Sequence, residues 1–153
     1  MHTAFGGRAV PVENIHLTLA FLGSVAVERI DELGAIGASV RTDRFQLNLT
    51  KSGCWKRSAV GWVAPDHAPA PLETLVLELR DRLAGAGFTV DDKPFSPHVT
   101  LLRKAKCAAK AQPPDTPFVW PVDRFVLVRS ETLKTGPVYS RIKEWFMRQK
   151  GGR

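Results

Sequence analysis

Apolar and polar residues alternate along several short stretches of the chain, and this period of two predicts β-strands. Two other stretches, residues 26–40 and 72–88, space their apolar residues at intervals of three and four, which predicts helices. Gly34 and Gly37 weaken the first helix, because glycine disfavours a helix interior. The predicted strands cover residues 15–22, 44–50, 52–55, 59–64, 98–104, 118–133 and 138–147.

This order of elements predicts an α+β fold with antiparallel sheets, because strands and helices do not alternate one by one. Each half of the chain contains one strand with the pattern His-x-Thr. The simplest arrangement is therefore two similar lobes whose motif strands face one central groove, with the helices outside. A length of 153 residues fits a single bilobal domain over residues 1–153.

The net charge of the chain indicates which class of partner it binds. Lys and Arg exceed Asp and Glu by seven, and the pI is near 9.9. Such a balance favours polyanionic partners, nucleic acid above all. No apolar run approaches the roughly 20 residues that span a bilayer, and no secretory leader is recognisable. We therefore expect no membrane partner and a cytoplasmic location.

The two cysteines, Cys54 and Cys107, lie far apart and match no metal-binding spacing. Neither belongs to a Cys-x-x-Cys pair. In a cytoplasmic protein, isolated cysteines are normally reduced thiols. We therefore expect two free thiols.

The two His-x-Thr strands carry the candidate chemistry. Residues i and i+2 of a strand point to the same side, so His16 lies beside Thr18, and His98 beside Thr100. Imidazole has an unperturbed pKa of about 6.5, so one histidine can accept a proton while the other donates one. Threonine hydroxyls can stabilise the nonbridging oxygens of a phosphate without a metal. A phosphodiester is the substrate that fits this set best.

Arg103 lies three residues beyond Thr100, so on a regular strand it faces the opposite side. It reaches a phosphate only if the strand twists, bulges or ends there, and from spacing alone a solvent-exposed charge is the simpler interpretation. The remaining histidines lack comparable surroundings: His2 is terminal and His67 belongs to a surface loop.

The alternatives to acid–base chemistry are less consistent with the pattern. A single histidine in a strand is more often structural than catalytic, but the motif occurs twice. A zinc site needs three or four ligands, and here no strand supplies two. The chain also lacks a phosphate-binding loop of the GxxxxGK[ST] type. We therefore predict no metal and no cofactor.

The motifs and their flanks resemble the two-histidine (2H) phosphoesterase superfamily, and more narrowly its RNA 2',3'-cyclic phosphodiesterases, historically called 2'-5' RNA ligases. The similar segments are PVENIHLTLAFLGSV (11–25), FQLNLTKSGCW (45–55), KPFSPHVTLLRK (93–104) and LVRSETLKTGPVYSRIKEW (127–145). The resemblance implies metal-independent hydrolysis of 2',3'-cyclic phosphates on RNA ends, tRNA halves included, or on nucleosides, to 2'-phosphates. It also implies reversible 2'-5' joining.

By position, the resemblance assigns acid–base roles to His16 and His98 and phosphate binding to Thr18 and Thr100. Arg103 matches an arginine that often follows the second motif. Which histidine is the base in hydrolysis stays open. Two further interpretations also stay open: an esterase acting on cyclic nucleotides, ADP-ribose cyclic phosphate or oligoadenylate, and a basic module that binds RNA ends without turnover.

The chain departs from the family at its beginning, where members usually carry a strand and a helix before the first motif. Here only about a dozen residues precede His16. We therefore expect a first lobe that is shortened at its N-terminus. A missing strand would expose a sheet edge, which favours homodimerisation.

Overall fold

The computed structural model describes residues 5–108, 110, 113–114 and 116–151, so His2 lies outside the described part of the chain. The chain forms two compact units, each built from three segments. Unit 1 comprises Met1–Thr18, Gln46–Ala68 and Ser96–Trp120, and unit 2 comprises Leu19–Phe45, Pro69–Phe95 and Pro121–Arg153.

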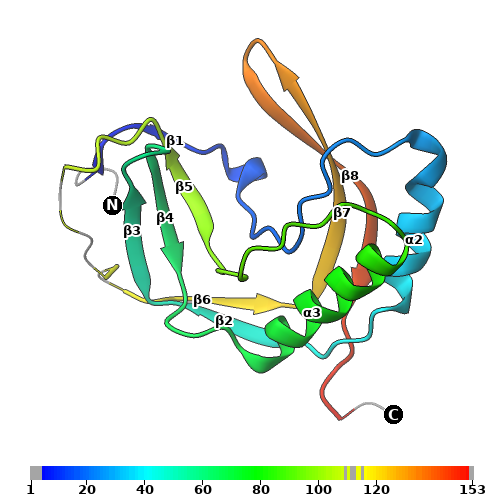
Figure 1. Ribbon diagram of the computed structural model, residues 1–153. Coiled ribbons are helices and arrows are strands. Elements are labelled where there is room, and N and C mark those ends of the chain that lie inside the picture. The colour runs from blue at the N-terminus through cyan, green and yellow to red at the C-terminus, as the bar shows by residue number, and fades with distance from the viewer. Residues whose placement is uncertain (1–4, 109, 111–112, 115, 152–153) are drawn as a thin grey trace. The chain divides into compact units, whose positions relative to one another are not determined.

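Unit 1 is built on a four-stranded sheet in the order β1-β5-β4-β3 (Figure 1). Every neighbouring pair in this sheet is antiparallel. A 3-10 turn, Val12–Asn14, follows the first strand. The strands are β1 (Arg8–Ala9), β3 (Lys51–Trp55), β4 (Val60–Ala64) and β5 (Val99–Arg103). Two more strands, β2 (Phe45–Leu49) and β6 (Phe118–Val122), pair with each other.

A small core at one end of this sheet contains a disulfide. Phe5, Leu102, Ala105 and Cys107 are buried together, and Cys54 packs against them. Cys54 and Cys107 are bonded to each other, with their Cα atoms 5.4 Å apart. The expectation of two free thiols is therefore wrong. It failed because sequence separation does not reveal that the segment after β5 returns to the edge of β3.

Unit 2 combines two helices with a long antiparallel ribbon. The helices are α2 (Ile30–Ser39), preceded by a 3-10 turn at Val27–Arg29, and α3 (Ala70–Gly85). The ribbon pairs β7 (Arg124–Leu133) with β8 (Gly136–Phe146). The apolar stripe of α3 is buried, as its spacing predicted, and it enters two core clusters with the ribbon and α2.

Close approach explains the glycines of α2. A Cβ atom on Gly37 would lie 2.4 Å from the Trp145 ring, and one on Gly34 would lie 2.7 Å from the Lys143 side chain. Both distances are shorter than real Cβ contacts. The Trp145 ring cannot easily give way, so α2 packs on β8 only with glycine at position 37, whereas the flexible end of Lys143 can move away from a side chain at position 34. Gly37, which weakens the helix locally, is therefore required by its packing.

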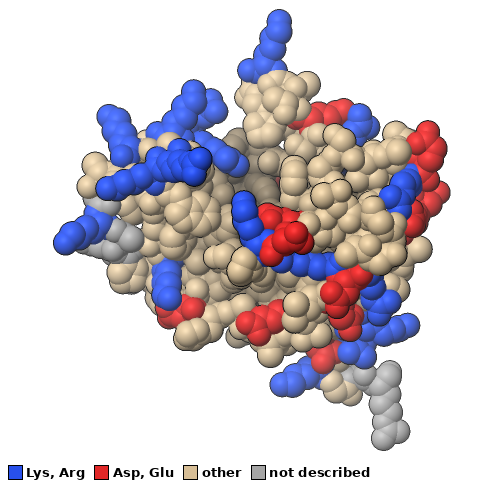
Figure 2. All heavy atoms as spheres, viewed as in Figure 1, with Lys and Arg blue, Asp and Glu red and all other residues tan. Residues whose placement is uncertain are grey.

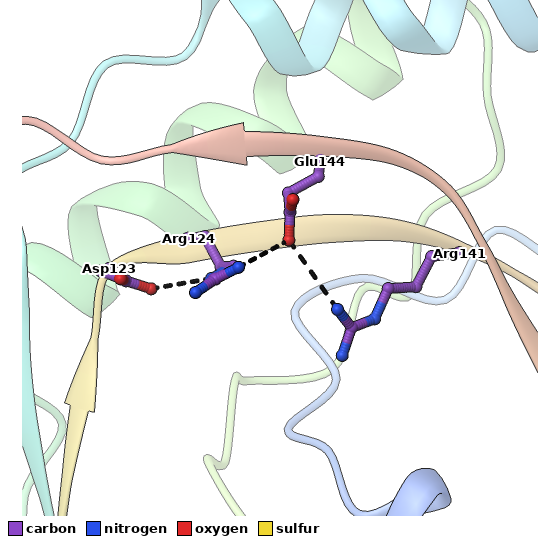
Figure 3. A network of polar contacts seen from close by, with 4 residues as sticks. All are labelled: Asp123, Arg124, Arg141 and Glu144. Carbon is purple, nitrogen blue, oxygen red and sulfur yellow. Dashed lines mark hydrogen bonds and ion pairs between the residues drawn. The ribbon is translucent and has the colours of Figure 1, made fainter.

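The outer surface of the ribbon carries a network of opposite charges (Figure 3). Arg124 donates hydrogen bonds to Asp123 (2.9 Å) and Glu144 (3.1 Å), and Arg141 lies 3.9 Å from Glu144. The bond from Arg124 holds the pKa of the Asp123 carboxyl below its ordinary value, and the two carboxylates raise the pKa of Arg124. Because such exposed pairs stabilise a protein little, we assign this network no functional role.

The α+β class with antiparallel sheets is confirmed, and so are both helices and most predicted strands. The strand predicted over residues 15–22 is wrong, because there the chain forms only one isolated bridge, at Leu17. Both motifs fall in unit 1, whose first segment ends at Thr18, directly before the first residue of unit 2. No helix in the described ranges is long and apolar enough to cross a bilayer.

Candidate active site

The two His-x-Thr motifs lie side by side in unit 1, although they are 82 positions apart. Leu17 forms an antiparallel bridge with Val99, at the centre of both motifs. In this register His16 lies opposite Thr100, and Thr18 lies opposite His98. The order of side chains is the same when the two segments are exchanged, so the motifs are related by a local twofold axis.

All four polar side chains of the motifs share one face of this pair of segments, because Leu17 and Val99 point to the other. Val99 is almost fully buried, with 2% of its surface exposed. Directly opposite residues in such a pair have Cβ atoms about 4.5–5.5 Å apart, and diagonal residues about 7–8 Å apart. The two histidines occupy the diagonal, which leaves room for a phosphate group between them.

Each histidine is held by the same hydrogen bond to its own backbone. His16 Nδ1 lies 2.6 Å from the carbonyl oxygen of Asn14, and His98 Nδ1 lies 2.9 Å from that of Ser96. A carbonyl oxygen only accepts, so Nδ1 carries a hydrogen in both rings. The Nδ1 bond thus sets the tautomer of each neutral ring and leaves Nε2 as the nitrogen with a lone pair that can accept a proton.

Tryptophan side chains fix the position of the second histidine. The Trp55 ring meets the His98 ring edge-on, with centroids 4.6 Å apart and planes at 77°. Trp55 in turn contacts Trp62, at 5.4 Å between centroids. Trp62 is the register partner of both Gly53 and Thr100, so the stack crosses the sheet next to the motif.

Gly53 makes this stack possible, and its replacement is expected to disturb the site. A Cβ atom at Gly53 would lie 2.2 Å from the Trp62 ring, so Gly53→Ala must displace Trp62 and, through it, Trp55. Overpacking of this kind costs about 1–3 kcal/mol. Urea unfolding measures the loss of stability, and the tryptophan emission spectrum reports the displacement of the two rings. Gly85→Ala is the matched control, because a Cβ atom there would meet nothing within 4 Å beyond the adjoining backbone of its own helix. Equal stability of the two variants would contradict the packing argument.

A bulge in β5 changes the face that Arg103 occupies. Trp62 pairs with Thr100 whereas Gly61 pairs with Leu102, so β5 contains one extra residue, Leu101, at this point. The extra residue reverses the alternation, and Arg103 shares the face of Thr100. The regular-strand argument put Arg103 on the other face. The bulge meets the condition under which Arg103 shares the face of Thr100, and no local sequence pattern predicts it.

Other groups lie apart from the motifs or had no signal in the sequence. His67 is exposed in a bend after β4, as predicted. A hollow of about 300 Å³ on unit 2, lined by residues such as Trp145 and Phe125, contains no motif side chain. In the part of the chain that the structure describes, no three His, Cys, Asp or Glu side chains gather as metal ligands. Sequence reasoning missed the two carbonyl partners, because a backbone acceptor leaves no trace in residue type.

Comparisons with known proteins show the family of the chain. The family model described as the 2'-5' RNA ligase superfamily matches residues 3–133. The RNA 2',3'-cyclic phosphodiesterase of Escherichia coli (strain K12) is 36% identical over 143 residues, which are 94% of this chain and 81% of that protein. The protein of the same name from Thermus thermophilus is 33% identical over 162 residues, covering 97% of this chain and 79% of its own.

Solved structures show the same fold. The crystal structure of E. coli LigT complexed with 3'-AMP has a TM-score of 0.86 and 36% identity, covering 97% of this chain and 84% of that one. The structure of E. coli LigT complexed with phosphate has a TM-score of 0.81 and 35% identity, covering 94% and 81%. At this identity and coverage the resemblance extends beyond the fold to the level of a common family.

Proposed function

Because the chain belongs to the 2'-5' RNA ligase superfamily, we propose that it is an RNA 2',3'-cyclic phosphodiesterase that opens cyclic phosphate ends to 2'-phosphates without a metal. The observation that carries this proposal is the antiparallel bridge between Leu17 and Val99, which supports a common face for the two histidines and two threonines around it. Each relative reported above carries the name of this activity. The 3'-AMP and phosphate complexes of LigT support a nucleotide phosphate as the ligand.

In the proposed reaction, water attacks the phosphorus atom while the bond between phosphorus and O3' breaks. One histidine takes the proton of the attacking water at Nε2. The other, protonated at the start, gives its Nε2 proton to the departing O3', so that a free 3'-hydroxyl and a 2'-phosphate form. The diagonal placement of His16 and His98 suits this in-line displacement, because the two groups act on opposite sides of the phosphorus. The structure gives no reason to prefer either as the base.

The two threonines and Arg103 stabilise the negative charge that develops on the nonbridging oxygens. Hydroxyl groups of Thr18 and Thr100 lie on the same face as the histidines and can donate to those oxygens. Arg103 reaches this face because of the bulge at Leu101, and its guanidinium can pair with phosphate. These roles agree with the assignments implied by the family.

Joining of RNA ends would use the same groups in the same roles, with a 5'-hydroxyl attacking the phosphorus atom in place of water, so that a 2'-5' bond and a free 3'-hydroxyl form. The family description favours this as a second activity. Homodimerisation, a single bilobal domain and a cytoplasmic location stay predictions. The Cys54–Cys107 disulfide argues against the last of these, since such bonds are typical of oxidising compartments.

Turnover in EDTA tests the proposal. We expect the wild-type protein to convert nucleoside 2',3'-cyclic monophosphates, and a short RNA with a cyclic end, to 2'-phosphates at the same rate with and without EDTA. Phosphorus NMR separates the 2'- from the 3'-phosphate. A 3'-phosphate product, or a rate that EDTA abolishes, would contradict the mechanism. Tight binding of the RNA by the folded protein without turnover would favour the binding module instead.

A further inference from the structure

One end of the unit 1 sheet gathers exposed cationic side chains from four segments of the chain. They come from β1, the turn between β3 and β4, the end of β5 and the segment after it. Figure 2 shows Lys and Arg side chains gathered over this end of the sheet. We call the cluster the cationic end; its members are Arg8, Lys56, Arg57, Arg103, Lys104 and Lys106.

Backbone pairing forces like charges together here. Arg8 is the register partner of Arg103, so two arginines lie directly opposite each other on neighbouring strands. Such a pair is destabilising in isolation. Gly7 permits it, because a Cβ atom there would lie 2.6 Å from the Arg103 carbonyl oxygen. An arrangement that brings two arginines together indicates an anionic ligand between or above them.

The backbone around the cationic end is also strained and tied together. Among the described residues, the non-glycine residues with positive φ are Ala59 (53°), Lys104 (53°) and Cys107 (50°). The amide of Ala105 donates to the Ala59 carbonyl at 2.9 Å, which joins the β3–β4 turn to the segment after β5. Strain of this kind concentrates at functional sites, because the surrounding structure must maintain it.

Among the residues that the structure describes, no acidic side chain pairs with these charges. None of the six residues forms an ion pair with any Asp or Glu in the described ranges. Asp66 pairs with Lys51, which is at the other end of β3. By sequence, unit 1 contains eight Lys and Arg against three Asp and Glu, whereas unit 2 contains fourteen against twelve. The excess positive charge of the protein is thus concentrated in unit 1.

From these observations we infer that the cationic end binds the backbone phosphates of the RNA strand whose cyclic end occupies the histidine site. The inference rests on the proposed function. A 2',3'-cyclic phosphate closes the 3' end of a strand, so the rest of the RNA leads away from the site in one direction only. Arg103 lies three residues from Thr100, about 10 Å at the 3.3 Å rise of a strand. The long Arg103 side chain spans this distance to the reacting phosphate, so the other members of the cluster lie beyond it, where they can meet the preceding nucleotides.

Lys56 and Arg57 allow a selective test, because they are exposed in the turn between β3 and β4 and belong to neither motif. The double variant Lys56→Gln/Arg57→Gln is compared with wild type on a ten-nucleotide RNA with a cyclic end and on a nucleoside 2',3'-cyclic monophosphate. We expect kcat/KM to fall at least tenfold for the RNA at low salt and to stay within twofold for the monophosphate. The slope of log kcat/KM against log salt for the RNA should decrease by about 1.4, because each single-strand phosphate that a cation no longer neutralises reduces it by about 0.7.

The matched control removes two charges from unit 2, as Arg82→Gln/Lys134→Gln, and is expected to leave both substrates unaffected. Binding of a labelled ten-nucleotide RNA with a 3'-phosphate, followed by anisotropy, tests the surface independently of catalysis. If wild type turns over neither substrate, the proposed function fails, while a tenfold loss of RNA binding in the Lys56/Arg57 variant alone still supports the cationic end. Equal RNA binding and turnover by wild type and both variants, or equal losses on RNA and monophosphate, would overturn the inference.

Discussion

His16→Ala and His98→Ala are each expected to lower kcat on a 2',3'-cyclic phosphate by about 10²–10⁴, the usual contribution of a positioned acid or base. Each histidine is held through Nδ1 by a backbone carbonyl, so its Nε2 has no substitute at the same position. Steady-state turnover of a nucleoside cyclic monophosphate is the measurement. The double variant should lose little more than either single one, because the two rings act in one step.

His67→Ala is the matched control, since it removes an imidazole from an exposed bend of the same unit. Its kcat should stay within twofold of wild type. A substrate with sulfur in place of O3' separates the two roles, because a thiolate leaves without being protonated. It should restore the rate of the variant that lacks the acid and leave the other variant slow. Either single alanine variant retaining more than a tenth of the wild-type rate would refute the paired mechanism.

Removal of the disulfide is expected to produce the largest change in stability. Cys54 and Cys107 are separated by 53 positions, and a bond that closes a loop of this size stabilises the folded state by about 2–4 kcal/mol. We expect the free energy of unfolding of the double variant Cys54→Ser/Cys107→Ser, measured with urea, to be lower by this amount. The single variants should behave alike, because each breaks the same bond. Wild type treated with a reductant should approach the double variant.

Thiol titration provides the complementary observation. The native protein should show no reactive thiol before unfolding in the presence of a reductant, and two afterwards. Two reactive thiols in the native protein, together with unchanged stability of the double variant, would restore the expectation of reduced cysteines. Loss of the bond should also loosen the end of β3, where Trp55 follows Cys54 and contacts His98. The reduced protein should therefore turn over more slowly even where it remains folded.

The sequence by itself determined the elements and the chemical groups. Helices 26–40 and 72–88 agree with α2 and α3, because a buried apolar stripe repeats at the helical period whatever it packs against. The motif alternation fixed which side chains share a face, because this depends only on the local backbone. His16, Thr18, His98 and Thr100 could therefore be chosen as a set before any contact was known.

Only the tertiary structure decided how these groups meet. It brought both motifs into one unit through the bridge between Leu17 and Val99, although residues 15–22 form no regular strand. It turned Arg103 toward Thr100 by a bulge and paired two cysteines expected to be free. The physical reason is the same in each case: register, bulges and cross-links depend on residues distant in sequence, whose approach is set by packing and leaves no local pattern in the chain.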